Sequence, residues 1–174
     1  MFFNASQLST ANQAFIQAEK WAGRFFGIDS EQFSAYRYDV KTLPYLAAHE
    51  VNDGAFAHLC RYRFEKHRPE RPEDFHFYRV CLQDDRILDA VERAISFIKL
   101  DPLMLYIATH ELVHVIRFDR GEIDFDAPQP EKEREEERVH DITKYILKPL
   151  PNPDLKLVID CFSNQYQIGD MMSH

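Results

Sequence analysis

Two histidines and one glutamate near the middle of the chain have the clearest potential for chemistry. Residues 109–114 read T-H-E-L-V-H and contain the pattern H-E-x-x-H. If this segment is helical, His110 and His114 leave the same face one turn apart. Such a pair can hold one zinc ion through two ring nitrogens at about 2.0–2.1 Å. Glu111 lies about 100° around the helix from His110, so we expect it to take a proton from a metal-bound water rather than to bind the metal.

The residues around this motif predict a buried helix. Asp101 and Pro102 form a typical start signal, with Asp101 as the cap and Pro102 at the first helical position. The segment that follows is largely apolar, with Leu103, Leu105, Tyr106, Ile107, Val113 and Ile116. The alternative is a core helix whose histidines only form hydrogen bonds. We favour a metal site, because these residue types at these offsets would arise by chance about 3 times in 100 in such a chain.

A hydrolytic zinc site usually has three protein ligands and leaves the fourth position to water. Residues 131–147 predict a further helix that could supply the third ligand. Its buried stripe is apolar: Val139, Ile142, Ile146 and Leu147. Glu136 and His140 lie on the same flank as this stripe, whereas Glu137 lies nearer the opposite face. A ligand must point inward, so Glu136 is the first candidate, His140 the second and Glu137 the third. His140 could instead act from beside the metal.

The two segments together resemble the gluzincin metallopeptidases, and residues 131–149 are most similar to the corresponding helix of the small ImmA/IrrE-type members. The motif on that helix runs roughly E-x-E-A-N-x-F-A-x-x-L-L-M-P. Its end falls on residues 146–149 here, its first glutamate on Glu136 and its asparagine on His140. The chain departs from the family at Arg138, in place of a second glutamate, and at Val113, in place of a glycine. The resemblance implies a zinc metallopeptidase with Glu136 as ligand.

The remaining segments predict an α+β fold that is mostly helical. Further helices are expected at residues 8–27, 85–99 and 152–166, and strands at 55–66 and 75–82. The strands could pair as a hairpin, and the loop between the two ligand helices could form one wall of a cleft. We therefore expect a single zincin-like domain over residues 1–174. In it, a small antiparallel sheet packs on the active-site helix, and a second ligand-bearing helix completes the site. In zincins an edge strand can pair with an extended peptide, which the resemblance implies here.

The two predicted strands interleave aromatic residues with Arg61, Arg63 and Arg79. This pattern can mark a surface for nucleic acid or an acidic substrate. We favour an ordinary sheet with an aromatic core face and a charged solvent face. The first strand places its large residues on one side: Phe56, Cys60, Tyr62 and Phe64.

Composition limits the partners and the compartment. The chain has 174 residues, of which 45% are hydrophobic, and a net charge of −8, so we expect a globular protein that does not bind nucleic acid. No apolar run reaches membrane-spanning length, and the first residues do not resemble a signal peptide. Three widely spaced cysteines argue against a disulfide framework and for a cytoplasmic protein with free thiols.

These features predict zinc-dependent hydrolysis of peptide bonds in a peptide or protein substrate. His110, His114 and Glu136 would hold Zn²⁺, Glu111 would be the general base for a metal-activated water, and His140 is a candidate oxyanion donor. The alternative is a catalytically weak zincin-like module that binds a metal or a partner protein. A hydrolase acting on a non-peptide amide is a third possibility. Other divalent ions would also suit two imidazoles and a carboxylate.

Overall fold

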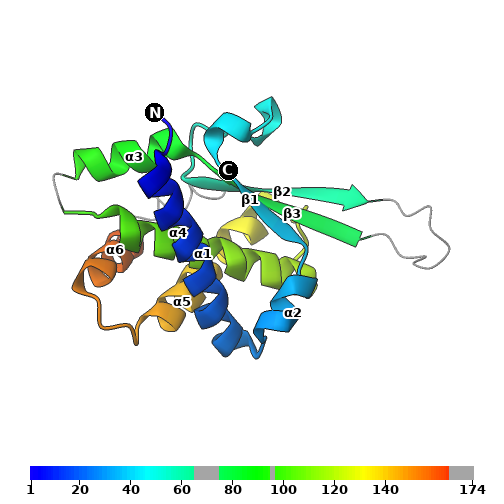
Figure 1. Ribbon diagram of the computed structural model, residues 1–174. Helices are drawn as coiled ribbons and strands as arrows, with labels where there is room; N and C mark the ends of the chain where they lie inside the picture. Colours follow the sequence, from blue (N-terminus) through cyan, green and yellow to red (C-terminus); the bar gives the residue numbers. More distant parts are fainter. Residues whose placement is uncertain (65–74, 95–96, 165–174) are drawn as a thin grey trace.

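The computed structural model describes residues 1–64, 75–94 and 97–164, and it has an α+β fold dominated by helices (Figure 1). The helices are α1 (Ala5–Phe26), α2 (Ser30–Ala35), α3 (Asp84–Arg93), α4 (Leu100–Asp119), α5 (Gln129–Leu147) and α6 (Pro153–Asn164). The strands are β1 (Tyr38–Lys41), β2 (Ala57–Phe64) and β3 (Phe75–Leu82), and the short 3-10 helices are η1 (Leu43–Tyr45) and η2 (Ala48–Glu50). In Figure 1, α1 crosses in front of α4, with the sheet above and α5 and α6 below.

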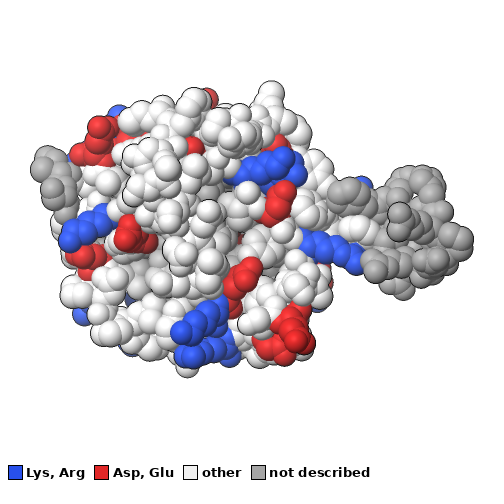
Figure 2. Space-filling view, viewed as in Figure 1, with Lys and Arg blue, Asp and Glu red and all other residues white. Residues whose placement is uncertain are grey.

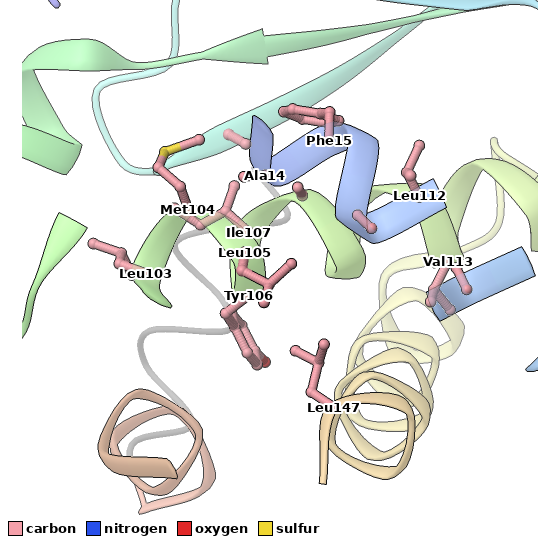
Figure 3. Close-up of a cluster of buried hydrophobic side chains, with 14 of the residues drawn as sticks. Ala14, Phe15, Leu103, Met104, Leu105, Tyr106, Ile107, Leu112, Val113 and Leu147 are labelled. Atoms are coloured by element: carbon pink, nitrogen blue, oxygen red, sulfur yellow. The ribbon is translucent and has the colours of Figure 1, made fainter. Parts of the chain in front are cut away.

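Helix α4 carries the H-E-x-x-H motif and forms the centre of the fold. Every residue from Pro102 to Arg117 is buried, as expected for a helix that is apolar around most of its circumference. It packs against α1, α3, α5, α6 and the strands β2 and β3. Figure 3 shows Ala14 and Phe15 of α1 on one side of α4 and Leu147 of α5 on another. The predicted central helix is therefore confirmed, and its position fixes the motif inside the core.

The predicted start of this helix was too late by two residues. The helix begins at Leu100 with Lys99 as its cap, so Asp101 and Pro102 both lie in the first turn. The Leu103 N–H donates to the carbonyl of Lys99. Proline is tolerated at Pro102 because the first N–H groups of a helix have no intrahelical partner.

The sheet is mixed, which corrects the predicted antiparallel sheet. Its order is β1-β3-β2, with β2 antiparallel and β1 parallel to β3. The predicted pairing of β2 with β3 is confirmed, whereas the loop predicted between them lies outside the described residues. Strand β1 was missed because it has only four residues and pairs with a strand far along the chain. The order leaves β2 at one edge of the sheet.

The predicted aromatic core face was correct for Phe56, which lies just before β2 and is buried in the main hydrophobic cluster, but it was wrong for Cys60 and Tyr62. The residues of β2 and β3 in the main hydrophobic cluster, or packed against it, are Ala57, Leu59, Val80 and Leu82. Cys60 and Tyr62 alternate with Leu59 along β2 and therefore point to the other face. That face also carries Arg79, which pairs with Cys60 in the register, and it lies beside η2 through the hydrogen bond from Tyr62 to Glu50. The predicted position of the Phe64 side chain lies outside the described part of the structure.

Helix α1 begins earlier than predicted and ends where predicted. Asn4, not Ser9 or Thr10, is the cap, and its side chain accepts from the N–H of Gln7 while Gln7 bonds back to Asn4. Gly27 ends the helix at φ 68°, a left-handed conformation that favours glycine.

The other helices differ from prediction mainly at their ends. Helix α3 stops at Arg93, short of the predicted 85–99, and residues 95–96 lie outside the described ranges. Asn152 accepts from the N–H groups of Asp154 and Leu155, which confirms the predicted cap of α6. The predicted end of that helix, beyond residue 164, is not described.

The remaining features of the fold are the distribution of surface charge, the character of the helices and the state of the cysteines. On the face shown in Figure 2, Lys and Arg side chains lie interspersed with Asp and Glu. None of the described helices combines the length and apolarity needed to cross a membrane. Cys60, Cys81 and Cys161 are free thiols, as predicted.

Candidate metal centre

Helices α4 and α5 bring three side chains together in the interior. His110 and His114 project from one face of α4, one turn apart, and Glu136 projects toward them from α5. Val139, Ile146 and Leu147 anchor α5 in the core, and this anchoring turns the flank that carries Glu136 toward α4. The helical phase predicted from the sequence is therefore confirmed for all three residues.

The donor atoms of the three residues lie close together, with a different oxygen of Glu136 beside each histidine. His110 Nε2 and His114 Nε2 are 3.2 Å apart. His110 Nε2 lies 3.1 Å from Glu136 Oε2, and His114 Nε2 lies 2.8 Å from Glu136 Oε1. A tetrahedral zinc site with bonds of about 2.0–2.1 Å needs donors about 3.3–3.4 Å apart. The observed separations are shorter than this by about 0.1–0.6 Å, so small outward movements of the side chains would let the two histidines and the Glu136 carboxylate hold a metal.

The electrostatics of the group favour a cation. Burial would raise the pKa of Glu136, but His114 and His110 outweigh burial and hold that pKa well below its ordinary value. Burial would lower the pKa of His114, but Glu136 raises it to about 9. Two Nε2 atoms at 3.2 Å repel each other unless a proton or a metal lies between their lone pairs and the carboxylate. The donor set of two imidazoles and one carboxylate therefore fits a divalent ion.

Glu111 is placed beside this group and not within it. Its side chain is almost fully buried, and Oε1 has no hydrogen-bond partner among the described residues. Burial, opposed by His114 and His110, raises the pKa of its carboxyl. A buried carboxylate with a free oxygen can accept a proton, and the role of Glu111 as general base stays a prediction.

A buried ion pair clamps the two ligand helices together. Arg117 of α4 donates from Nε to Glu135 Oε2 at 2.7 Å and from Nη2 to Oε1 at 3.0 Å. Arg117 follows His114 by three residues, and Glu135 immediately precedes Glu136. The clamp therefore fixes the distance between the helices at the ligands. Sequence reasoning missed it, because charged side chains are expected at the surface.

Two cavities meet at Glu136. The first, of about 360 Å³, is lined by Glu111, His114 and Glu136 and lies between β2, α4 and α5. Residues 123–125 of the loop between α4 and α5 form part of its wall, as predicted for this loop. The second, of about 490 Å³, is lined by His110, Glu136 and His140. The metal group therefore borders open space on both sides, with Glu111 on the side of the first cavity.

His140 lies on the wall of the second cavity, away from Glu111. Ser163 Oγ donates to the carbonyl of Ile159, so it accepts from Nε2 of His140 at 3.0 Å. Nδ1 then accepts from the hydroxyl of Tyr106. This arrangement keeps His140 neutral, and burial, followed by His110, lowers its pKa. Both ring nitrogens are occupied, so His140 is poorly placed either as the third ligand or as an oxyanion donor in the first cavity.

Glu137 is exposed and lines the second cavity, outside the metal group. Among the described residues that group has three members, His110, His114 and Glu136. Of the three candidates from the sequence for the third ligand, the geometry therefore selects Glu136.

Residues of the first cavity that sequence reasoning missed come from β2 and the end of α4. His58, Cys60 and Tyr62 line it at the strand. Contact with Cys60, opposed by burial and aided by Glu111, raises the pKa of His58. At the other end, Phe118 stacks on His114 with ring centroids 5.8 Å apart and packs on Phe125 at 5.0 Å. The only sequence feature that could have identified Phe118 is its position four residues, or about one helical turn, after His114.

Comparison of the chain with family models, curated proteins and solved structures gave no match. The resemblance to gluzincin metallopeptidases therefore stays a prediction based on the two motifs.

Proposed function

We propose that this protein is a zinc-dependent metallopeptidase that hydrolyses peptide bonds in the first cavity. The observation that carries the proposal is the open three-ligand group. His110, His114 and Glu136 converge without a fourth His, Cys, Asp or Glu among the described residues, and the first cavity is lined by His114 and Glu136 together with Glu111. A structural zinc site is closed by four protein ligands, whereas a catalytic one keeps a position for water or substrate.

The chemistry divides between the bound ion and the side chains. Zinc held by the three ligands would act as a Lewis acid that lowers the pKa of a water molecule and polarises a carbonyl. Glu111 takes the proton of the attacking water and delivers it to the leaving amine nitrogen. Its burial suits this role, because a carboxylate with a raised pKa is a stronger base than an exposed one.

The predicted oxyanion donor, His140, is replaced by His58 in this proposal. His58 lines the same cavity as Glu111, whereas His140 is engaged by Tyr106 and Ser163. An imidazole N–H of His58 would be a hydrogen-bond donor to the negative charge that develops on the substrate carbonyl oxygen.

The shape of the first cavity suits an extended peptide. Strand β2 lies at the edge of the sheet and lines this cavity, so its outer edge can pair with the backbone of a substrate. Beyond His114, the wall is made of Phe118, Ile123 and Phe125. This end would accept a bulky apolar side chain next to the cleaved bond.

The competing proposal is a module that binds a metal or a partner and hydrolyses little. The burial of the centre favours it, because only 1% of Glu111 and 1% of His110 is exposed. The same peptide assay distinguishes the two functions.

The test compares zinc-loaded wild type, Glu111→Gln and Glu137→Gln on a complex peptide library, with products identified by mass spectrometry. Glu137 is a matched control, since it is an exposed glutamate outside the metal group. We expect cleavage by the wild type and by Glu137→Gln, and none by Glu111→Gln with its zinc still bound. No cleavage by zinc-loaded wild type, or equal cleavage by Glu111→Gln, would overturn the proposal.

A further inference from the structure

A second cluster of side chains that could bind a metal consists of His49, Glu50 and Cys60, and His49 and Cys60 also line the first cavity. His49 and Glu50 come from η2, and Cys60 comes from β2. One donor atom from each residue lies within 4.8 Å of the other two. The three residues are far apart from the H-E-x-x-H motif in the sequence, and the proposed hydrolysis uses none of them.

The surroundings hold Glu50 firmly in this cluster. Oε1 of Glu50 accepts from the N–H of Ala47 at 2.8 Å. Oε2 accepts from the hydroxyl of Tyr62 and from Nη1 of Arg79, the latter at 3.0 Å. A carboxylate offers about four lone-pair positions, so one remains for a cation. Such support from outside the ligand set is what orients a metal ligand.

The charge around the cluster admits a divalent cation despite Arg79. The guanidinium of Arg79 donates to both carboxylate oxygens of Asp39, at 2.9 and 3.1 Å, so this pair is neutral. Glu50 contributes one negative charge. Cys60 contributes a second when metal binding releases its thiol proton to solvent. Two negative charges and a neutral imidazole then face the ion.

The other two ligands can reach the ion by small movements. Zinc bonds of about 2.0–2.3 Å require donor atoms about 3.3–3.6 Å apart, so a separation of up to 4.8 Å must shorten by about 1 Å. His49 is exposed and gives up only a hydrogen bond of 2.8 Å to Tyr62. Cys60 is half-buried and lines the first cavity, so rotation of its side chain can bring Sγ closer to the other two ligands.

We propose that His49, Glu50 and Cys60 form a second metal site, which binds a zinc-like divalent ion separately from the centre on α4 and α5. A thiolate, an imidazole and a carboxylate select zinc over magnesium or calcium, which prefer oxygen ligands alone. The ion would link η2 to β2 and thereby stabilise the part of the wall of the first cavity that His49 and Cys60 form. This site does not depend on hydrolysis at the first.

Cobalt separates the two sites by spectroscopy. The centre on α4 and α5 has no sulfur ligand, so only the second site gives the near-ultraviolet charge-transfer absorption of a thiolate bound to Co²⁺. Metal-free protein is titrated with Co²⁺ in three forms: wild type, Cys60→Ser and Cys161→Ser. Cys161 is the control because it is also half-buried but lies on α6. Circular dichroism checks that each variant is folded.

We expect the wild type and Cys161→Ser to bind two ions and to show the absorption, which zinc then abolishes. Cys60→Ser should bind one ion and show none. His49→Ala, with every cysteine intact, should keep the absorption but weaken cobalt binding at the second site at least about tenfold. Glu136→Ala should retain the absorption, because removing the Glu136 carboxylate affects only the centre on α4 and α5. Absence of the absorption in the wild type, its persistence in Cys60→Ser, or unchanged affinity in His49→Ala would overturn the proposal.

Discussion

Arg117 and Arg138 contact the same glutamate, Glu135, but only Arg117 is buried. We therefore expect very different effects from mutating the two arginines. Arg117 is 10% exposed and binds both oxygens of Glu135, which is 3% exposed. Arg138 is 55% exposed and reaches Glu135 Oε1 at 3.2 Å. Removing one partner from a buried ion pair costs about 3–5 kcal/mol, and without Arg117 the buried carboxylate of Glu135 would keep only its contact with the exposed Arg138. Losing an exposed pair costs about 0–1 kcal/mol.

We therefore expect Arg117→Ala to lower the free energy of unfolding by about 3–5 kcal/mol and Arg138→Ala by less than about 1 kcal/mol. For a chain of this size, the first change corresponds to a fall in Tm of about 6–20 °C. Chemical and thermal unfolding would be followed by circular dichroism at pH 7 in the presence of a chelator, since bound metal adds its own stability. The chelator confines the comparison to the ion pair.

A double variant provides the internal check. Arg117→Met with Glu135→Leu removes both charges and should recover most of the lost stability. In the presence of zinc, Arg117→Ala should also weaken metal binding about 10–100-fold, because the clamp supports the neighbouring ligands. Equal stabilities for Arg117→Ala and Arg138→Ala, with unchanged zinc affinity, would refute the account of the clamp.

Three further predictions concern the ligands, the sheet and the cavity. Glu136→Ala should lose the metal of the α4–α5 centre while His140→Ala keeps it, and zinc retained there by Glu136→Ala would exclude Glu136 as ligand. Burial would raise the pKa of Glu50, but Tyr62, the Ala47 N–H and Arg79 together lower it to about 2. Because of this lowered pKa, the ionised carboxylate of Glu50 contributes about 3 kcal/mol to the free energy of unfolding. This contribution is complete above about pH 4.5 and is lost as the pH falls toward 2. Acid unfolding of Glu50→Gln should lack this component, and identical acid curves would contradict the assignment. Phe125→Ala should reduce cleavage next to bulky apolar side chains about 10-fold or more relative to small ones, measured as kcat/KM on matched peptides, and an unchanged ratio would exclude this wall from recognition.

Local patterns predicted the longer helices α1, α3, α4, α5 and α6 and the phase of the site residues, because helical phase depends only on nearby residues, whereas the six-residue helix α2 was not predicted. The spacing of His110 and His114 defined one face of α4, and the apolar stripe of α5 selected Glu136 from a run of glutamates. Adjacent Glu135 was not singled out, although it is buried, because its partner Arg117 lies on another helix. A pairing between distant elements leaves no periodic signal in either one.

The sheet was predicted less well for the same reason. Strand β1 pairs in parallel with β3 across about forty residues of chain, shown by the register of Val40 with Val80. Alternation in β2 was visible, but the sequence did not show which face would meet the core. Tyr62 was assigned to an aromatic face, whereas its hydroxyl bonds to Glu50 on the outer side. No pattern in the sequence therefore indicated that His58 and Cys60 line the first cavity.

The most direct test of the central claim is the zinc content of the purified Cys60→Ser variant, measured by elemental analysis after dialysis against excess zinc and then buffer. This background removes the sulfur ligand of the second site, so the remaining zinc reports on His110, His114 and Glu136. We expect one zinc ion per chain in this variant, and none once Glu136→Ala is added. A folded Cys60→Ser protein without zinc, or one that keeps its zinc after the loss of Glu136, would contradict the metal centre on which the proposed function depends.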